Sequence, residues 1–326
     1  MARTLGDREL RALLARLADG RRHSGATLAR EARVTRAALA KRIQKLETLG
    51  VEVEARFGLG YRLAQAIELL EPDLIVGALP APVRARLAVE VAFGTDSTNR
   101  RLLESGGDEP RALLAEHQTA GRGRRGRAWH SPLGQNLYLS LAWTFAQWPP
   151  QLTALPLAVG IATAQALQQL GLAGVKLKWP NDLVVGGHKL GGILIEQRGE
   201  AAGACRAVIG LGLNVTMAAA PGITQPWTSL AQAMAPASAP SRNALAARIL
   251  AHWVEMLDRF ASDGFAPFAS AWQALDATLG RTVTVHADPP YEGIARGVDA
   301  SGALQVECTG GQRRVLAGDV SLRVAP

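Results

Sequence analysis

The chain contains 326 residues, of which 48% are hydrophobic and 20% are charged, and its formal net charge is +8. This composition excludes a wholly disordered protein, and the length predicts two or three domains with a substantial core. No apolar run is long enough to cross a membrane and no apolar signal core follows residues 1–8, so we expect a cytoplasmic protein without a membrane partner.

The positive charge is concentrated near the N-terminus. Residues 1–63 hold fourteen of the 36 Lys and Arg and seven of the 28 Asp and Glu, which leaves a nearly balanced 22 and 21 for the remainder. This asymmetry favours a polyanion partner for the N-terminal segment, with general solubility as the alternative. The two cysteines, Cys205 and Cys308, and the six scattered histidines show no metal-ligand spacing, so we expect free thiols and no transition metal bound by protein ligands.

The first 66 residues carry the pattern of a winged helix-turn-helix. Apolar spacing predicts helices at 10–17, 25–32 and 36–49, followed by an alternating strand at 51–56, a glycine turn and a return strand at 61–63. A small three-helix module for protein contacts is the alternative. The third helix turns its apolar stripe inward and its basic residues elsewhere, so it predicts DNA contacts at Thr35, Arg36, Lys41, Arg42 and Lys45.

Residues 67–83 are apolar and proline-containing, and they predict a helix and linker before a second domain at 84–277. A strand at 87–93 leads through a turn of small polar residues, 94–99, into a helix at 100–104. Such residues suit helix caps, which is the more common role, and they suit equally a polar ligand.

A loop of glycine and arginine follows the strand at 112–115. Arg122, Arg124, Arg125 and Arg127 alternate with Gly121, Gly123 and Gly126. Glycine lets the backbone approach a ligand closely and guanidinium groups bind phosphate or carboxylate, so the loop predicts an anion site; a solvated basic turn is the alternative. Trp129, at the end of the loop, offers a flat face to a heterocycle.

A second polar stretch lies further along the chain, after a predicted strand at 136–143 and a helix at 155–170. Residues 175–185 predict a strand interrupted by a Trp-Pro-Asn-Asp turn, and Gly186-Gly187 predicts a hairpin whose return strand, 188–196, has Lys189 near its start. Gly191 and Gly192 leave space beside that strand for a ligand or another backbone. The ammonium group of Lys189 is therefore expected at the mouth of the sheet, although a lysine extended along an edge is the commoner case.

The remaining segments support this core. Residues 217–240 predict a surface loop, and 242–260 and 265–275 predict helices. Short strands at 282–285, 293–297, 304–307, 315–317 and 320–324 predict a small SH3-like β-barrel at 278–326. The expected fold is thus α+β and multidomain, with a central mixed sheet between the winged helix and the barrel.

Several motifs in order give the chain a resemblance to a known family. They are Asp-Ser-Thr-Asn at 96–99, Gly-Arg-Gly-Arg-Arg-Gly-Arg at 121–127, Lys-Trp-Pro-Asn-Asp-Leu at 178–183 and Lys-Leu-Gly-Gly-Ile-Leu-Ile-Glu at 189–196. Over residues 10–324 the chain resembles biotin protein ligases, in the bifunctional bacterial form that also represses the biotin operon.

The resemblance implies an ATP-dependent ligase that uses Mg²⁺, forms biotinyl-5′-AMP and transfers biotin to a lysine of the biotin carboxyl carrier protein of acetyl-CoA carboxylase. It also implies that the adenylate acts as corepressor and that the adenylate-bound form is a homodimer that binds operator DNA. A ligase with a non-regulatory winged helix and a ligand-sensing regulator without catalysis are the alternatives. Lipoyl transfer on a related fold is disfavoured because the motifs are the biotin set.

The resemblance also assigns residues. It implies biotin contacts from Ser97, Thr98, Asn99, Gln118, Gly121, Arg122, Arg124, Lys189 and Gly192. Nucleotide contacts are implied for Arg122, Arg127, Trp129, Asn181, Asn214 and Arg323. Lys189, Arg122 and Arg124 would neutralise charge during adenylation, and Asp182 is the candidate for orienting the acceptor amine.

Overall fold

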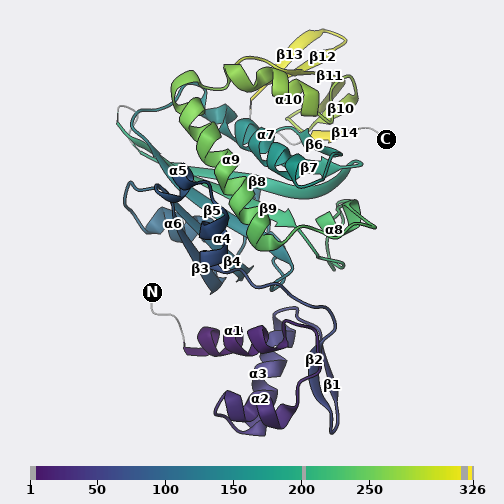
Figure 1. The fold of residues 1–326 in the computed structure, drawn as a ribbon. Helices are drawn as coiled ribbons and strands as arrows, with labels where there is room; N and C mark the ends of the chain where they lie inside the picture. Colours follow the sequence, from purple (N-terminus) through teal and green to yellow (C-terminus); the bar gives the residue numbers. More distant parts are fainter. Residues whose placement is uncertain (1–4, 200–202, 317–321, 325–326) are drawn as a thin grey trace.

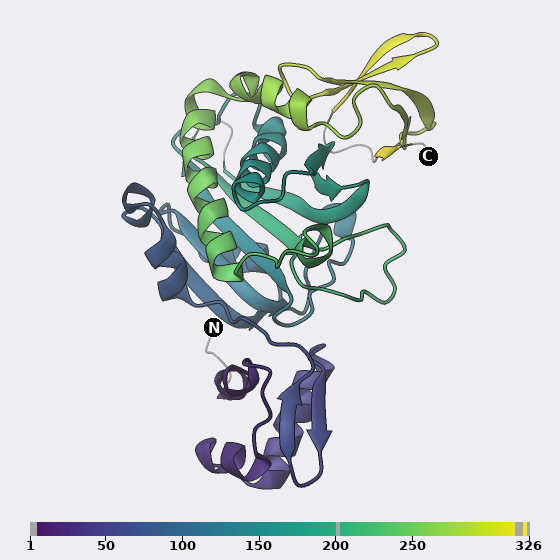
Figure 2. The ribbon, with the colours of Figure 1, turned by 45° about the vertical axis from the view of Figure 1, so that its right-hand side comes forward.

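The computed structural model describes residues 5–199, 203–316 and 322–324 (Figure 1). A helical unit with a two-stranded hairpin lies at one end, a seven-stranded sheet forms the middle, and a five-stranded sheet lies at the other end (Figures 1 and 2). Among the described residues no helix is long and apolar enough to cross a membrane.

The N-terminal unit contains the three predicted helices and the wing. Its elements are α1 (Leu5–Leu17), α2 (Gly25–Glu31), α3 (Arg36–Thr48), β1 (Val53–Arg56) and β2 (Gly60–Leu63). The Thr35 hydroxyl caps α3 by accepting a hydrogen bond from the backbone N–H of Ala38 at 3.2 Å. Ser24 holds the corresponding position before α2, but its side chain makes no capping bond. The leucines of α1 and the apolar stripe of α3 form a buried core that also takes in Phe93 and Leu133 of the middle unit.

The segment predicted as a linker is ordered against both units. It forms α4 (Pro72–Ala78) and α5 (Ala81–Arg84), and Leu70, Ile75, Leu79 and Val83 join the main hydrophobic core. The linker is therefore part of the packed molecule, a property that its alanine- and proline-rich composition does not indicate.

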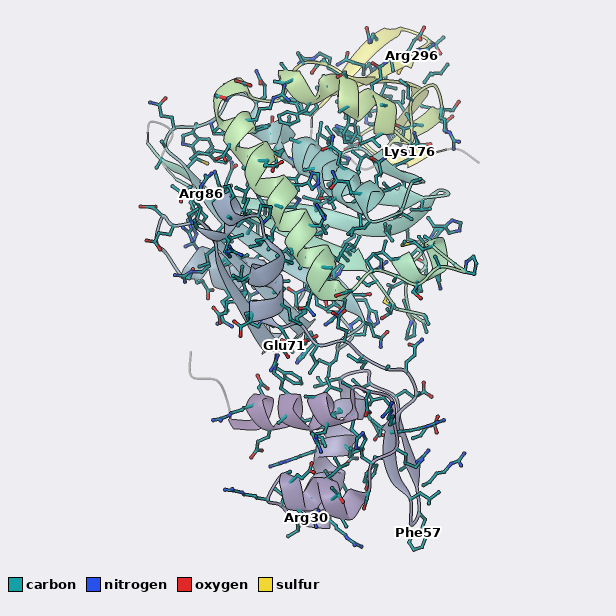
Figure 3. All side chains as sticks on the ribbon, viewed as in Figure 1. Arg30, Phe57, Glu71, Arg86, Lys176 and Arg296 are labelled. Atoms are coloured by element: carbon teal, nitrogen blue, oxygen red, sulfur yellow. The ribbon has the colours of Figure 1, made fainter. Side chains whose placement is uncertain are left out.

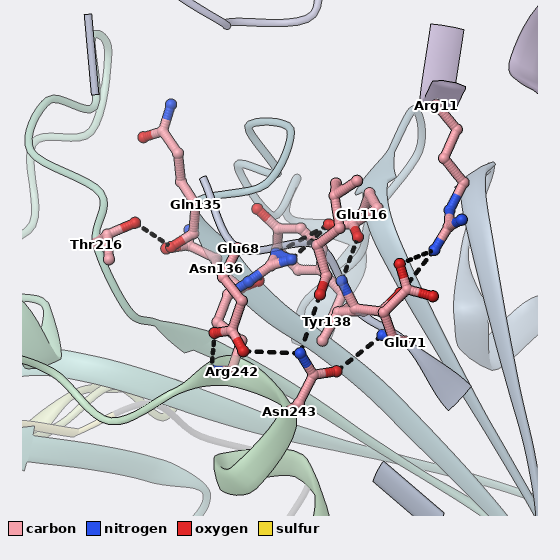
Figure 4. A network of polar contacts seen from close by, with 12 residues as sticks. Arg11, Glu68, Glu71, Glu116, Gln135, Asn136, Tyr138, Thr216, Arg242 and Asn243 are labelled. Carbon is pink, nitrogen blue, oxygen red and sulfur yellow. Dashed lines mark hydrogen bonds and ion pairs between the residues drawn. The ribbon is translucent and has the colours of Figure 1, made fainter. Parts of the chain in front are cut away.

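A network of polar contacts holds the start of this linker (Figure 4). The Glu116 carboxylate is fully buried, accepts a hydrogen bond from Leu70 N at 2.6 Å and pairs with Arg242, whose Nη1 lies 3.0 Å from Oε2. Asn243 donates to Leu69 O at 2.9 Å and accepts from Glu71 N at 2.8 Å. Arg11 of α1 reaches the same segment through Leu70 O at 3.0 Å and the Glu71 carboxylate at 2.9 Å.

The middle sheet is mixed, with strand order β3-β4-β5-β9-β8-β7-β6. β3 and β4 are parallel, whereas the other neighbours are antiparallel. The strands are β3 (Ala88–Thr95), β4 (Arg111–Gln118), β5 (Asn136–Phe145), β6 (Val175–Lys178), β7 (Asp182–Val185), β8 (His188–Arg198) and β9 (Cys205–Asn214). The prediction of one interrupted strand at 175–185 was wrong in topology, because the Trp-Pro-Asn turn reverses the chain and pairs Lys178 with Asp182.

Helices cover both faces of this sheet. α7 (Leu155–Gln169) and α9 (Arg242–Asp263) pack on one face, where Ala112 and Leu114 of β4 join the main core (Figure 1). α6 (Thr98–Glu104) packs on the other, where Leu113 and Ala115 form a smaller cluster with Leu102. Successive residues of a strand point to opposite faces, which explains the alternation along β4.

The C-terminal part begins after the short helix α8 (Leu230–Ala233), α9 and α10 (Ala269–Leu275). Its sheet has the order β13-β12-β11-β10-β14 and every pairing is antiparallel. The strands are β10 (Thr282–Val285), β11 (Tyr291–Val298), β12 (Leu304–Cys308), β13 (Gly311–Val315) and β14 (Leu322–Val324). Within the described residues β13 and β14 do not pair, so the sheet is open there; Ala317, Val320 and Ser321 of the predicted strands lie outside the described residues. Single turns of 3-10 helix occur at Arg124–Gly126, Leu152–Ala154 and Ala266–Phe268.

Candidate active site

A cavity of about 1390 Å³ lies between the glycine–arginine loop, the turn before β7, the start of β8 and the loop at 223–227. The structure brings to its wall most of the residues expected at the nucleotide. These nucleotide residues are Arg122, Arg127, Trp129, Asn181 and Asn214. The cavity is also lined by Arg124, Lys189 and Gly192, which were predicted to contact biotin, and by Asp182, which was predicted to orient the acceptor amine.

Lys189 lies at the mouth of the sheet, as expected from its place in β8. Its Nζ is 2.7 Å from Asp182 Oδ1 and 5.5 Å from the centre of the Trp129 ring. A Cβ on Gly192 would be in ordinary van der Waals contact with Lys189 Nζ, at 3.4 Å, so Gly192 lies directly beside the ammonium group. The backbone of Lys189 is fixed as well, because its N–H donates to Pro226 O and its carbonyl accepts from Thr228 N.

The glycine–arginine loop folds back on itself along one wall of the cavity. Trp129 N donates to Gly121 O at 2.9 Å, and Gly123 N donates to Arg127 O at 2.7 Å. These bonds close the loop at its base, and residues 122–125 and 127–130 line the cavity. The loop therefore has a defined backbone, while the side chains of Arg122, Arg125 and Arg127 remain exposed.

Two of its arginines make polar contacts across the site. Arg122 Nη2 lies 3.3 Å from Glu196 Oε1 on β8, and Arg124 Nη1 donates to Asn181 Oδ1 at 3.3 Å. Burial lowers the pKa of the Arg124 guanidinium from its usual value, with neighbouring Arg125 acting in the same direction. An anionic ligand would stabilise the charged form of this guanidinium group, because the ligand would replace the solvation that burial has removed.

A second, narrow cavity of about 30 Å³ adjoins the first. It is lined by the predicted biotin residues Ser97, Thr98, Asn99 and Gln118, and it shares Arg122, Trp129, Gly192 and Leu194 with the larger cavity. Polar groups converge here by hydrogen bonding to one another: Gln118 Oε1 accepts from Thr98 N at 2.9 Å and from Thr98 Oγ1 at 3.1 Å.

Two glycines of β9 make room for these side chains. A Cβ on Gly210 would fall 2.3 Å from Asn99 Oδ1, and a Cβ on Gly212 would fall 2.3 Å from the Trp129 ring. Trp129 thus lies over β9 at the junction of the two cavities, and its Nε1 is buried without a hydrogen-bond partner. The structure places this ring beside the small polar cavity as well as beside the expected nucleotide position.

The other predicted site residues lie in different places. Arg323 belongs to β14, where its backbone pairs with that of Thr284; its side chain is not among the parts of the chain that the structure describes. Of the predicted DNA contacts, Thr35, Arg36, Lys41 and Lys45 are exposed. Arg42 instead turns toward α1, where its Nη2 lies 2.8 Å from Glu9 Oε1.

Three residues that line a cavity or bond to its lining residues were not assigned from the sequence. Ser140 lies 2.6 Å from Asn99 Oδ1 and 2.7 Å from Thr98 Oγ1; a serine within the apolar strand at 136–143 was the available signal. Glu196 accepts from Asn99 Nδ2 at 2.9 Å, and its signal was its place at the end of the motif at 189–196. Trp227 pairs with Lys189 through the backbone, and nothing local in a long loop predicts that contact.

Comparisons with known proteins agree with this geometry. Residues 93–214 match the sequence profile of the biotin/lipoate A/B protein ligase family, residues 278–323 that of the biotin protein ligase C-terminal domain, and residues 9–62 that of an HTH domain. The bifunctional ligase/repressor BirA of Escherichia coli is 40% identical over 318 residues, covering 96% of this chain and 97% of that protein. Its Bacillus subtilis counterpart is 29% identical, covering 88% and 90%.

Solved structures agree as well. The biotin protein ligase from Aquifex aeolicus in complex with biotin and ATP has a TM-score of 0.64 and 27% identity, covering 73% of this chain and 99% of that chain. The chain therefore belongs to the biotin protein ligase family, in the form that carries an N-terminal helix-turn-helix domain.

Proposed function

We propose that this protein is an ATP-dependent biotin protein ligase that forms biotinyl-5′-AMP and transfers biotin to a lysine of the biotin carboxyl carrier protein. The observation that carries the proposal is the convergence of Lys189, Arg122 and Arg124 on one cavity that continues into a small polar pocket. The larger cavity has the volume for a nucleotide, and the smaller one offers the hydrogen-bonding groups that a ureido ring requires.

Adenylation brings a carboxylate against the α-phosphorus of ATP, so two anions must approach each other. In our proposal Lys189 and the loop arginines neutralise this charge, and the carboxylate oxygen forms a bond to phosphorus as pyrophosphate leaves. Lys189 is suited to this role because Asp182 and the Trp129 ring hold its ammonium group at the wall of the larger cavity, beside Gly192, which lines both cavities. The ammonium would exchange part of its pairing with Asp182 for the substrate oxygens.

The adenylate is a mixed anhydride that water would hydrolyse. Loop 121–129, with Arg127 and Trp129, would cover it, and Asn181 and Asn214 at the cavity wall would contact the nucleotide. Asp182 would then orient the acceptor amine, which attacks the acyl carbon and releases AMP. Ser97, Thr98, Asn99, Gln118 and Gly121 would bind biotin, and we keep Arg323 as a nucleotide contact.

Mg²⁺ fits this site as an ion carried by the triphosphate. The described residues contain no group of three or more His, Cys, Asp and Glu side chains able to hold a metal, whereas Mg²⁺ is commonly bound by phosphates with one or two carboxylates. Asp276 belongs to the cavity wall and its Oδ2 is buried without a hydrogen-bond partner, so this carboxylate would hold the ion together with the phosphates. When bound, it would offset phosphate charge during adenylation.

For the N-terminal unit we propose repression of biotin synthesis genes, with biotinyl-5′-AMP as corepressor and a homodimer as the DNA-binding species. Exposed Arg36, Lys41 and Lys45 on α3 support the DNA contact. We further propose the domain bounds 1–66, 67–83, 84–277 and 278–326, and a C-terminal sheet that closes as an SH3-like barrel.

The deciding experiment follows label from biotin to the carrier. The protein is incubated with labelled biotin, ATP, Mg²⁺ and a purified carrier domain; label on the carrier and AMP in solution support ligation, and their absence would favour a sensor without catalysis. Lys189→Ala should abolish pyrophosphate release, whereas Arg86→Ala, which changes an exposed cation outside the cavity, should leave it unchanged. Wild-type pyrophosphate release by Lys189→Ala would show that the site is misassigned.

A further inference from the structure

Two large apolar side chains project from the tip of the wing. Phe57 is fully exposed and Leu59 is 59% exposed, and both lie in the turn between β1 and β2. Gly58 separates them with a φ of +76°, and a side chain built on it would meet nothing within 4 Å. The tip is therefore a narrow apolar projection surrounded by solvent, which is an unfavourable arrangement in an isolated protein.

The base of the wing is held firmly, so the tip is presented in a fixed position. Glu54 on β1 and Arg62 on β2 form two hydrogen bonds of 2.8 Å across the hairpin. Arg22, from the turn before α2, donates to Gly60 O at 3.1 Å and contacts Glu54. A Cβ on Gly60 would fall 1.9 Å from His23 O, so the hairpin lies directly against that turn. This clamp lets the tip penetrate a partner without first losing much conformational freedom.

The tip lies at the end of the N-terminal unit that is remote from the ligase unit, as does the start of α3. Leu49, after the end of α3, accepts a hydrogen bond from Leu133 N of the middle unit, so the opposite end of α3, at Arg36, points away from that unit. Figure 3 shows Phe57 at the same distal end of the molecule as Arg30 of α2. Arg56, next to Phe57, is exposed as well. An apolar projection with an exposed guanidinium group beside it complements a groove lined with phosphates.

We propose that Phe57 and Leu59 enter the minor groove of duplex DNA as an apolar wedge while α3 occupies the adjacent major groove. This inference rests on the proposed DNA binding and adds to it a specific mode of contact. Apolar side chains inserted between base steps unstack them and bend the duplex, and flanking arginines bind the phosphates on either side. A protein partner is less suited to this surface, because the first 63 residues carry an excess of seven positive charges.

The test uses the full-length protein with biotin, ATP and Mg²⁺, and a duplex that the wild-type protein has enriched from a random-sequence pool. Affinity is measured over a range of salt concentrations, and bending is measured by energy transfer between dyes on the two DNA ends. Phe57→Ala should weaken binding about tenfold or more, since it removes the burial of one aromatic side chain, and should reduce the bend. Its salt dependence should stay unchanged, because no phosphate contact is lost.

Two further variants separate an apolar wedge from a wing that binds DNA by charge alone. Phe57→Lys adds a charge; an electrostatic wing would bind DNA more tightly and with a steeper salt dependence, whereas a wedge must bind more weakly and bend less. Leu59→Ala is compared with Leu74→Ala, since Leu74 is 60% exposed on α4 and away from the wing; the first should lose affinity and the second should not.

The outcomes are distinguishable. If the wild-type protein enriches no DNA, the proposed repressor function fails and this inference fails with it. If the wild-type protein binds and bends DNA and Phe57→Ala does the same, only the wedge is overturned. A variant that changes self-association but not the bend would also overturn it, by assigning the tip to a second copy of the chain.

Discussion

Glu116→Gln tests the buried ion pair that holds the linker to the ligase unit. The substitution keeps an oxygen that can accept from Leu70 N, but it removes the negative charge beside Arg242. Arg242 is 3% exposed and would keep one hydrogen bond, from Nη1 to Asn136 O at 3.2 Å. The variant therefore leaves a guanidinium group buried without a counter-ion.

Removing one partner of a buried pair destabilises a protein by about 3–5 kcal/mol, and the two remaining hydrogen bonds place this variant near 3 kcal/mol. For a chain of this size that corresponds to a fall of about 4 °C in Tm. Removing Arg242 instead should change how the stability depends on pH. Burial raises the pKa of Glu116, and the charge of Arg242 opposes that rise. In Arg242→Met the opposing charge is lost, so Glu116 would keep its proton in the folded state at a pH where it releases that proton in the unfolded state. The stability of Arg242→Met should therefore fall as pH rises above the ordinary range of a glutamate.

The assay is thermal and urea unfolding of the purified variants. Asp258→Asn is the matched control, because it makes the same chemical change in a two-bond pair with Arg86 that is about half exposed, and it should lose less than about 1 kcal/mol. The double variant Glu116→Gln with Arg242→Met should recover most of the lost stability. A loss for Glu116→Gln no larger than that of Asp258→Asn would refute the reasoning.

Three further predictions concern the ligase and DNA sites. Asp182→Asn should slow transfer to the carrier in single-turnover assays started from the preformed adenylate; transfer at the wild-type rate would remove this residue from that step. Gly210→Ala should weaken biotin binding at least tenfold, as measured by calorimetry, since its methyl group would lie 2.3 Å from Asn99 Oδ1 and displace that amide. Unchanged affinity would mean that the Asn99 amide does not contact biotin. Lys41→Ala should lower the magnitude of the slope of log DNA affinity against log salt concentration by about 1. Arg42→Ala should change that slope little, because Arg42 pairs with Glu9. Equal slopes for the two variants would contradict this distinction.

Local patterns predicted a large part of the fold. Apolar periodicity located the three N-terminal helices and the wing, and Gly186-Gly187 located the β7–β8 hairpin, because these features depend on residues close in sequence. The polar turn at 179–182 was predicted, but its reversal of the chain into two antiparallel strands was not, since a short apolar strand does not reveal whether the chain continues or turns back. The linker was also described incompletely, because Asn243 and Arg242, which hold it, lie about 170 residues further along.

The candidate site shows a similar division. Residues within the sequence motifs, such as Lys189 and Arg124, lie on one cavity as expected. The direction of a side chain was harder to predict: Arg42 belongs to the outward half of its helix, yet a glutamate on α1 draws it inward. Ser140 and Trp227 reach the site only through the pairing of distant strands and loops, which no local pattern contains.

The polar contacts of segment 67–71 have a consequence for gene control. Because α1 and the ligase unit both form hydrogen bonds to these few residues, α3 is held at a fixed distance and angle from the seven-stranded sheet. In an assembly of two ligase units, the gap between the two reading helices would follow from the subunit geometry. The subunit geometry would then set the spacing of half-sites along the promoter, and inserting one residue into this segment would mismatch the protein with its genomic target.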